Sequence, residues 1–271
     1  MIRAYLLLLF LALAGSGLYA QRQLPANQNI YGATGRGIIY DHELNFIFGI
    51  ASPRNVFAGV RSGKLVTYDK LRYWSATIGT IRHARERREN PDRVNPATNR
   101  VSRAYTYGKI NQLYALRVGF GMRKYLSEKA RQRGVAVGYS YEFGPTLGLL
   151  KPYYVEYITG EPGNDGTGIE DIRYNGDNIN QFLNQDRIFG ASTWALGLDE
   201  IRFRPGIHAR ASAHFGFGAF DEVSKSLEAG LMADFFPGNT DLMLESELTP
   251  GVSNSPLFLS LFINVQFGKR W

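Results

Sequence analysis

The stretch that decides the fold is Leu257–Trp271, which reads L-F-L-S-L-F-I-N-V-Q-F-G-K-R-W. Alternate positions carry large apolar side chains: Leu257, Leu259, Leu261, Ile263, Val265, Phe267 and Trp271. The positions between them are mostly polar or small: Ser260, Asn264, Gln266, Gly268 and Arg270, with Phe258 and Phe262 as exceptions. Because successive side chains of a strand point to opposite faces, this stretch predicts a β-strand with one apolar and one polar side. Such a strand is typical of the last strand of a transmembrane β-barrel, whose apolar side contacts lipid.

The first twenty residues have the parts of a secretory signal peptide. A basic start, M-I-R, is followed by an uncharged run at 6–13 and by small residues that end at Ala20. About a dozen apolar residues are too few for an uncleaved anchor that spans a bilayer. We therefore expect export and cleavage after Ala20, followed by a polar periplasmic segment at 21–42.

The composition narrows the class of protein. The chain has no cysteine, which excludes disulfides, thiolate chemistry and Cys-ligated metals. After the signal peptide no run of eighteen apolar residues occurs, so no helical membrane span is expected. The net charge of +7 is evenly spread, which argues against nucleic acid as a partner. The segment 160–171 lacks the ligand spacing of a calcium loop, and we expect neither a metal nor a cofactor.

Alternation recurs often enough to predict eight strands between residues 43 and 271. They are expected at 44–50, 56–63, 71–82, 110–123, 135–157, 207–217, 226–235 and 257–271. The fifth strand has a bend or bulge at Gly144-Pro145; if that dipeptide is a turn instead, the count becomes ten. The faces of the third strand are ambiguous.

The connectors alternate in length, except for the short one after the first strand. Those after the second, fourth and sixth strands are short, whereas 83–107, 159–205 and 237–256 are long, with one helical turn expected near 178–184. Bacterial outer-membrane barrels have an even strand number, short periplasmic turns and longer outside loops. The sequence thus predicts an all-β, antiparallel transmembrane barrel with long extracellular loops.

These features give the chain a resemblance to a known class. With the signal peptide, the segments I-H-A-R-A-S-A-H-F-G-F (207–217) and F-I-N-V-Q-F-G-K-R-W (262–271) resemble small outer-membrane β-barrel proteins of Bacteroidota-type envelopes. The resemblance covers 43–271 and is architectural, so it implies no functional residue. It implies an integral protein of a Gram-negative outer membrane, with roles that range from passive stability to subunits of secretion or barrel-assembly machinery.

The polar parity of the strands carries many charges: Arg61, Arg117, Arg123, Glu142, His208, Arg210, His214, Glu228, Asp234 and Arg270. A soluble lipocalin-type barrel would place these polar side chains outside. The number of charges among them instead favours the inside of a barrel that is surrounded by lipid. Eight strands leave room only for side chains, and charges removed from water need partners. We therefore expect an ion-paired, closed interior, with a narrow pore as an alternative.

The sharpest catalytic hypothesis concerns His208-x-Arg210-x-Ser212-x-His214 on one strand face. Ser212 and His214, with Glu228 to orient the imidazole, are candidates for a lipid A-modifying enzyme. Same-face neighbours on a strand lie about 7 Å apart, however, which is too far for a serine–base hydrogen bond. An interior hydrogen-bonded network is the favoured interpretation.

Two long loops differ in charge. The basic loop contains Arg82, Arg85, Arg87, Arg88, Arg93, Arg100 and Arg103. The acidic loop contains Glu161, Asp165, Glu170, Asp171, Asp177, Asp186, Asp199 and Glu200. Arginine suits phosphates and carboxylates, so the basic loop is expected to bind lipopolysaccharide, an acidic envelope protein or the acidic loop itself. Long loops on a small barrel favour contacts, and we expect a non-enzymatic subunit or scaffold of an outer-membrane protein complex.

Overall fold

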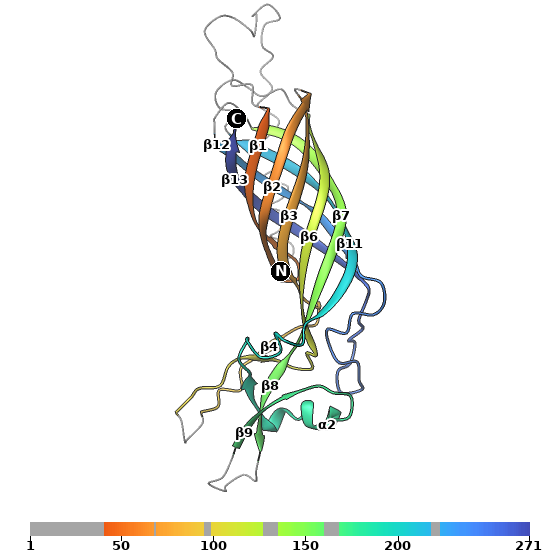
Figure 1. Cartoon of the computed structure of the whole chain (residues 1–271). Coiled ribbons are helices and arrows are strands. Elements are labelled where there is room, and N and C mark those ends of the chain that lie inside the picture. Colours follow the sequence, from red (N-terminus) through yellow and green to blue (C-terminus); the bar gives the residue numbers. More distant parts are fainter. Residues whose placement is uncertain (1–40, 68, 95–98, 127–134, 160–167, 218–222) are drawn as a thin grey trace, which may run out of the picture. The chain divides into compact units, whose positions relative to one another are not determined.

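The structure is a computed structural model, and it describes residues 41–67, 69–94, 99–126, 135–159, 168–217 and 223–271 (Figure 1). The predicted signal peptide and residues 21–40 of the predicted periplasmic segment lie outside the described residues. No helix in the described part of the chain is long and apolar enough to cross a membrane.

A closed antiparallel barrel of eight strands forms the body of the described chain. Its strands are β1 (His42–Ala51), β2 (Asn55–Thr67), β3 (Lys70–Ile81), β6 (Asn111–Tyr125), β7 (Ala136–Pro152), β11 (Arg202–Phe217), β12 (Val223–Phe235) and β13 (Leu257–Arg270). They follow one another around the barrel in chain order, and β13 closes on β1 (Figure 1). The predicted all-β class, antiparallel barrel and strand count of eight are confirmed.

The seam between β1 and β13 is fully paired. Its register runs from Glu43 opposite Arg270 to Ala51 opposite Phe262. Beyond the strand end, the Trp271 N–H donates to the His42 carbonyl at 3.0 Å. The final strand therefore removes both sheet edges, which are the main aggregation hazard of an open sheet.

The alternation of β13 sorts its side chains as expected. Leu259 and Leu261 on the outer side are 69% and 65% exposed, whereas Asn264 and Gln266 are buried inside. The structure also resolves the two faces of β3, which the sequence leaves ambiguous. Tyr73 faces the interior and is 3% exposed, whereas Trp74 faces outward and is 47% exposed. The barrel thus has an apolar outer wall and a polar interior.

The fifth strand passes through Gly144-Pro145 without a turn, so the alternative count of ten is wrong. Pairing of β6 with β7 lapses opposite this dipeptide and resumes in the same register, while β11 pairs with β7 continuously. Proline has no N–H to donate, which explains the local gap. The expected extension of this strand to residue 157 is also wrong, because β7 ends at Pro152 and the next strand joins another sheet.

The three long loops emerge at one end of the barrel and fold together. The loop strands are β4 (Arg88–Glu89), β5 (Tyr105–Thr106), β8 (Tyr154–Thr159), β9 (Gly168–Arg173) and β10 (Ile188–Ala191). Strand β8 lies between β10 and β9, and β4 pairs with β5. Two short helices, α2 (Ile179–Phe182) and η2 (Gln185–Arg187), complete this loop domain, and α2 lies within the predicted helical turn. Its core is formed by Tyr105, Val155, Phe182, Leu183, Ile188 and Leu244.

A second apolar cluster closes the loop end of the barrel. Phe236 and Leu242, from the connector between β12 and β13, pack on inward residues of the barrel strands such as Leu113 and Leu150. The Ile110 N–H donates to the Leu242 carbonyl at 2.9 Å, which fixes this connector to the start of β6. The loop domain and the barrel are therefore joined by a packed core as well as by the chain.

Candidate functional site

The structure places all ten residues of the predicted interior network inside the barrel. Each is at most 5% exposed. They come from six strands, because the polar parity of each strand points inward and closure of the sheet brings these parities together. Arg61, Arg117 and Arg123 are among the largest fully buried side chains of the described residues.

Glu228 is the hub of this network. Its Oε1 accepts hydrogen bonds from Arg61 Nη1 at 2.7 Å and Arg123 Nη2 at 3.2 Å, and lies 3.2 Å from His214 Nδ1. The Arg61 guanidinium also stacks 4.2 Å from the centre of the Tyr73 ring. A carboxylate with several charge-assisted partners is held in one rotamer, and it holds its partners in turn.

Glu142 organises the neighbouring level. Its carboxylate lies 3.4 Å from Arg61 Nη2, 3.2 Å from His208 Nε2 and 3.7 Å from Arg210 Nη1. Arg210 Nη2 donates to Thr77 Oγ1 at 2.9 Å. Arg61 therefore links the two carboxylates into one network across the lumen.

Nearer the loop end, Arg117 and Asp234 form a separate pair. Arg117 Nε donates to Asp234 Oδ1 at 2.6 Å and Nη2 donates to Oδ2 at 2.9 Å. This two-pronged geometry is the strongest that an arginine–carboxylate pair adopts.

Glu43 is an interior acid that the sequence reasoning missed. It is fully buried and accepts from Arg123 Nη1 at 2.8 Å, with Arg270 Nε 3.6 Å from its other oxygen. The sequence predicts the first strand from residue 44, which leaves out the inward-facing position 43. The alternation of Leu44, Phe46 and Phe48, extended by one residue, is the signal that finds it.

The buried arginines and carboxylates of the eight strands nearly balance. Five arginines, Arg61, Arg117, Arg123, Arg210 and Arg270, face four carboxylates, Glu43, Glu142, Glu228 and Asp234, which leaves a difference of one positive charge. Burying an ion is costly unless partners surround it, so near-balance is required of a filled barrel. The interior is therefore occupied by interlocked charged side chains.

The candidate catalytic residues lie in this network without forming a serine–histidine pair. Ser212 Oγ lies 2.7 Å from Ser140 Oγ on the neighbouring strand, and Ser140 Oγ donates to Glu228 at 3.3 Å. His214 contacts Glu228, as the hypothesis required, and its ring packs edge-on against Tyr125. The described contacts thus connect Ser212 to Glu228 through Ser140, and connect His214 to Glu228 directly.

The basic loop contacts the loop that follows β7. Arg93 Nη1 donates to the Asp186 carbonyl at 2.6 Å, and Arg100 forms an ion pair with Glu156. The Ala191 N–H donates to the Arg103 carbonyl at 3.1 Å. These contacts use one side of the basic loop, while Arg85, Arg87 and Arg88 are exposed and make no ion pair with a described residue. The backbone N–H of Arg82 donates to Asn55 Oδ1 at 2.9 Å.

A buried pair in the loop domain had no sequence signal. Lys109 Nζ lies 2.6 Å from Glu86 Oε1 and donates to Gln112 at 2.6 Å, with both charged residues under 10% exposed. Burial lowers the pKa of Lys109, although Glu86 opposes the shift. This pair anchors the basic loop to the base of β6, and a lone lysine between β5 and β6 gives no pattern that predicts it.

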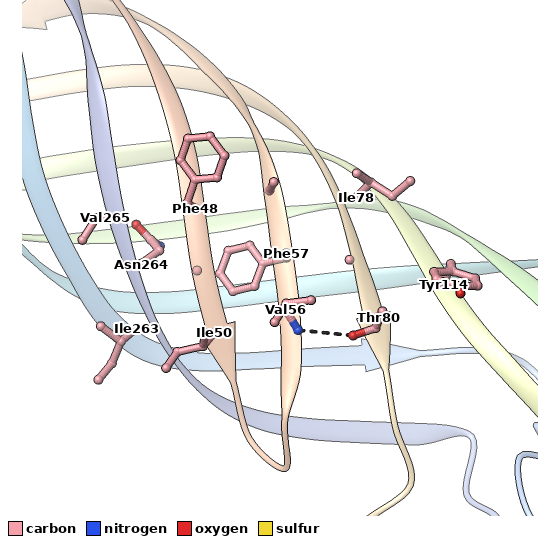
Figure 2. Close-up of a pocket in the computed structure, with 13 residues that line it drawn as sticks. Phe48, Ile50, Val56, Phe57, Ile78, Thr80, Tyr114, Ile263, Asn264 and Val265 are labelled. Atoms are coloured by element: carbon pink, nitrogen blue, oxygen red, sulfur yellow. Dashed lines mark hydrogen bonds between the residues drawn. The ribbon is translucent and has the colours of Figure 1, made fainter. Parts of the chain in front are cut away.

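The outer wall carries an apolar depression across β1, β2 and β3 (Figure 2). Phe48, Ile50, Val56 and Ile78 border it, with Ala58 and Gly79 among the small residues that hollow it. The Val56 N–H donates to Thr80 Oγ1 at 3.2 Å, so this hydroxyl is satisfied within the wall (Figure 2). The depression has the character of the surrounding wall and adds no reactive group.

No protein family model matches this sequence, and a comparison with curated proteins finds no match either.

Proposed function

We propose that this chain is an integral outer-membrane β-barrel with a closed interior, which acts as a non-enzymatic subunit or scaffold of an envelope protein complex. The observation that carries the proposal is the separation of side chains by the barrel wall. Large apolar residues cover the outside, and every carboxylate of the eight strands is buried inside. A soluble barrel would invert this arrangement, because exposed apolar area on that scale drives association in water.

The height of the apolar wall supports a membrane location. Ten residue steps separate Leu257 from Phe267, the outward apolar ends of β13. At about 3.4 Å per step and a tilt of about 40°, they rise roughly 26 Å along the barrel axis. The apolar band of outer-membrane barrels is about 25 Å tall.

The filled interior supports a closed barrel rather than a pore. The Arg117–Asp234 pair and the Glu228 hub lie at different levels of the lumen, and the Phe236 cluster covers the loop end. In planar bilayers the purified full-length protein should show no unitary conductance steps. Steady, reproducible steps would contradict the closed interior.

The loop domain supports the scaffold role. Three connectors form one folded unit with its own core, and it carries Arg85, Arg87 and Arg88, which make no ion pair with a described residue. A rigid surface of this kind suits contact with another envelope protein or with lipopolysaccharide phosphates, since arginine forks recognise both groups.

The test is isolation of the tagged chain from its native membranes. Alkaline carbonate should fail to extract it, detergent should release it, and a defined set of envelope proteins should co-purify in constant ratio. The triple variant Arg85→Gln/Arg87→Gln/Arg88→Gln should lose partners held by the loop. Lys225→Gln, at the opposite end of the barrel, is the control. Recovery of the barrel alone at full yield would overturn the subunit role, and release by carbonate would overturn the membrane location.

A further inference from the structure

Six outward-facing cations surround the end of the barrel that is opposite the loop domain. This basic girdle consists of Lys64, Lys70, Arg72, Lys124, Lys225 and Lys269. They occupy outward positions on β2, β3, β6, β12 and β13, between the large apolar residues of the wall and a last set of exposed apolar residues, Val66, Leu126, Val223 and Trp271. Lys269, for example, is two residues beyond Phe267, and Arg72 is two residues before Trp74.

The girdle has no acidic counterpart on the outer wall. The four carboxylates of the eight strands, Glu43, Glu142, Glu228 and Asp234, are all buried in the interior. None of the six cations forms an ion pair with another described residue. Two described aspartates lie outside the strands at this end of the barrel: Asp41, which directly precedes β1, and Asp69, which directly precedes Lys70.

Like charges within the girdle are placed directly opposite one another. Lys64 pairs with Arg72 across β2 and β3, and Lys70 pairs with Lys124 across β3 and β6. Directly opposed like charges destabilise a sheet, because the side chains of such pairs are only about 5 Å apart at Cβ. Four cations crowded on three neighbouring strands, without an ion pair to a described residue, therefore suit an anionic partner.

We propose that the basic girdle binds the phosphate headgroups of anionic phospholipids in the membrane leaflet at this end of the barrel. The inference rests on the membrane location proposed above and adds a lipid class and a leaflet. Cations at the margin of an apolar wall lie at headgroup depth, where each lysine or arginine gains about 1 kcal/mol from an anionic surface. The spread of the girdle over five strands fits a ring of lipids better than one protein contact.

The chain contains its own reporters for this proposal. Trp74 and Trp271 lie beside the girdle and are 47% and 56% exposed, whereas Trp194 belongs to the loop domain. In a Trp194→Phe background, tryptophan fluorescence therefore reports lipids at the girdle. The full chain is reconstituted into phosphatidylcholine vesicles that contain equal fractions of either brominated phosphatidylglycerol or brominated phosphatidylcholine. The apparent association constant of each quencher is then compared.

Phosphatidylglycerol should associate about fivefold or more strongly than phosphatidylcholine, the ratio expected from one cation–headgroup contact. The preference should fall to about one when all six girdle cations are replaced by Gln, and in molar salt. Arg187→Gln/Arg202→Gln, at a half-buried and an exposed position away from the girdle, is the control and should keep it. If the sixfold variant fails to fold, the partial loss in Lys64→Gln/Lys70→Gln and the salt series provide the measurement.

Equal association of the two lipids with the unaltered girdle would overturn the proposal, and is also the result expected if an acidic protein is the partner. A preference that survives in the girdle variant would overturn it as well. Absence of quenching by either lipid would contradict the membrane location itself, so the two failures are distinguishable.

Discussion

Arg117 on β6 and Asp234 on β12 meet across the lumen through two hydrogen bonds of 2.6 and 2.9 Å, although β7 and β11 separate their strands around the wall. Both residues are at most 1% exposed. Removing one partner leaves an uncompensated buried charge, which costs about 3–5 kcal/mol. Asp234→Ala should lower the free energy of unfolding by that amount, measured by urea titration of the barrel in lipid vesicles.

The double variant Arg117→Met/Asp234→Leu separates the stability that the ion pair contributes from the cost of burying a lone charge. Apolar replacement of both partners is often close to neutral, so the double variant should be more stable than Asp234→Ala alone. Asp241→Ala is the control. Asp241 is exposed, and the hydrogen bond that it accepts from Asn111 goes to its backbone carbonyl, which the substitution keeps. If Asp234→Ala is no more damaging than Asp241→Ala, the pair does not hold the lumen closed.

Ser212→Ala should leave the lipid A of the host membrane unchanged. The Ser212 hydroxyl lies 2.7 Å from the Ser140 hydroxyl, while the described hydrogen bond of His214 goes to Glu228, so a serine–histidine pair is not formed between Ser212 and His214. Mass spectrometry of lipid A from cells with the wild-type chain, Ser212→Ala and a deletion strain makes the comparison. A modification that disappears in both altered strains, with the variant folded at normal level, would favour the lipid-modifying enzyme.

The loop domain should lose stability at high pH because of one tyrosine. Burial, with a smaller contribution from Glu89, raises the pKa of Tyr105 to about 12. An unfolded tyrosine titrates near pH 10, so the native state holds its proton more tightly. This contribution is complete below about pH 10 and is lost as the pH rises through about 12.

Hydrogen exchange of residues around β5 and β8, followed between pH 8 and 12, measures this effect. Amide opening should increase above pH 10 beyond the intrinsic rise, and Tyr105→Phe should remove most of the excess. Tyr114→Phe is a comparison at a tyrosine on the outer wall. An excess of the same size in Tyr105→Phe would assign the pH dependence to another group.

The barrel was predictable because its outer and inner faces differ in polarity. An apolar outside and a polar inside give each long strand a strict two-residue period, so the eight strands and the interior position of Arg61 or Asp234 follow from parity. The loop domain was not predictable in this way. Strands β9 and β10 have 6 and 4 residues, and their pairing depends on contacts of Val155 and Ile188 with distant loops. Glu43 was lost to a boundary error of a single residue, which matters because its partner Arg123 comes from the far side of the lumen.

Closure of the barrel should depend on Gly268, which lies on the inner side of the seam. A Cβ at this position would lie 1.8 Å from the Leu44 carbonyl oxygen and 2.7 Å from the Asn45 Cα. Both are backbone atoms of β1 and cannot move aside as a side chain can. An added methyl group must therefore push β13 away from β1. The Gly268→Ala variant should therefore fold poorly, with a reduced heat-modifiable band on gels after refolding into vesicles.

Gly216→Ala is the matched control, because it is also an inward glycine of a barrel strand. The atoms nearest to a Cβ there are His214 Nε2 at 3.3 Å, Ala136 Cβ at 3.6 Å and the Ala136 carbonyl oxygen at 3.7 Å, so the approach to backbone is much looser. Truncation of the last ten residues, which removes most of β13, sets the lower limit of folding. If Gly268→Ala folds as well as Gly216→Ala, the β1–β13 seam tolerates separation and another contact must close the barrel. If it folds no better than the truncated chain, the approach of β13 to Leu44 is the step on which closure depends.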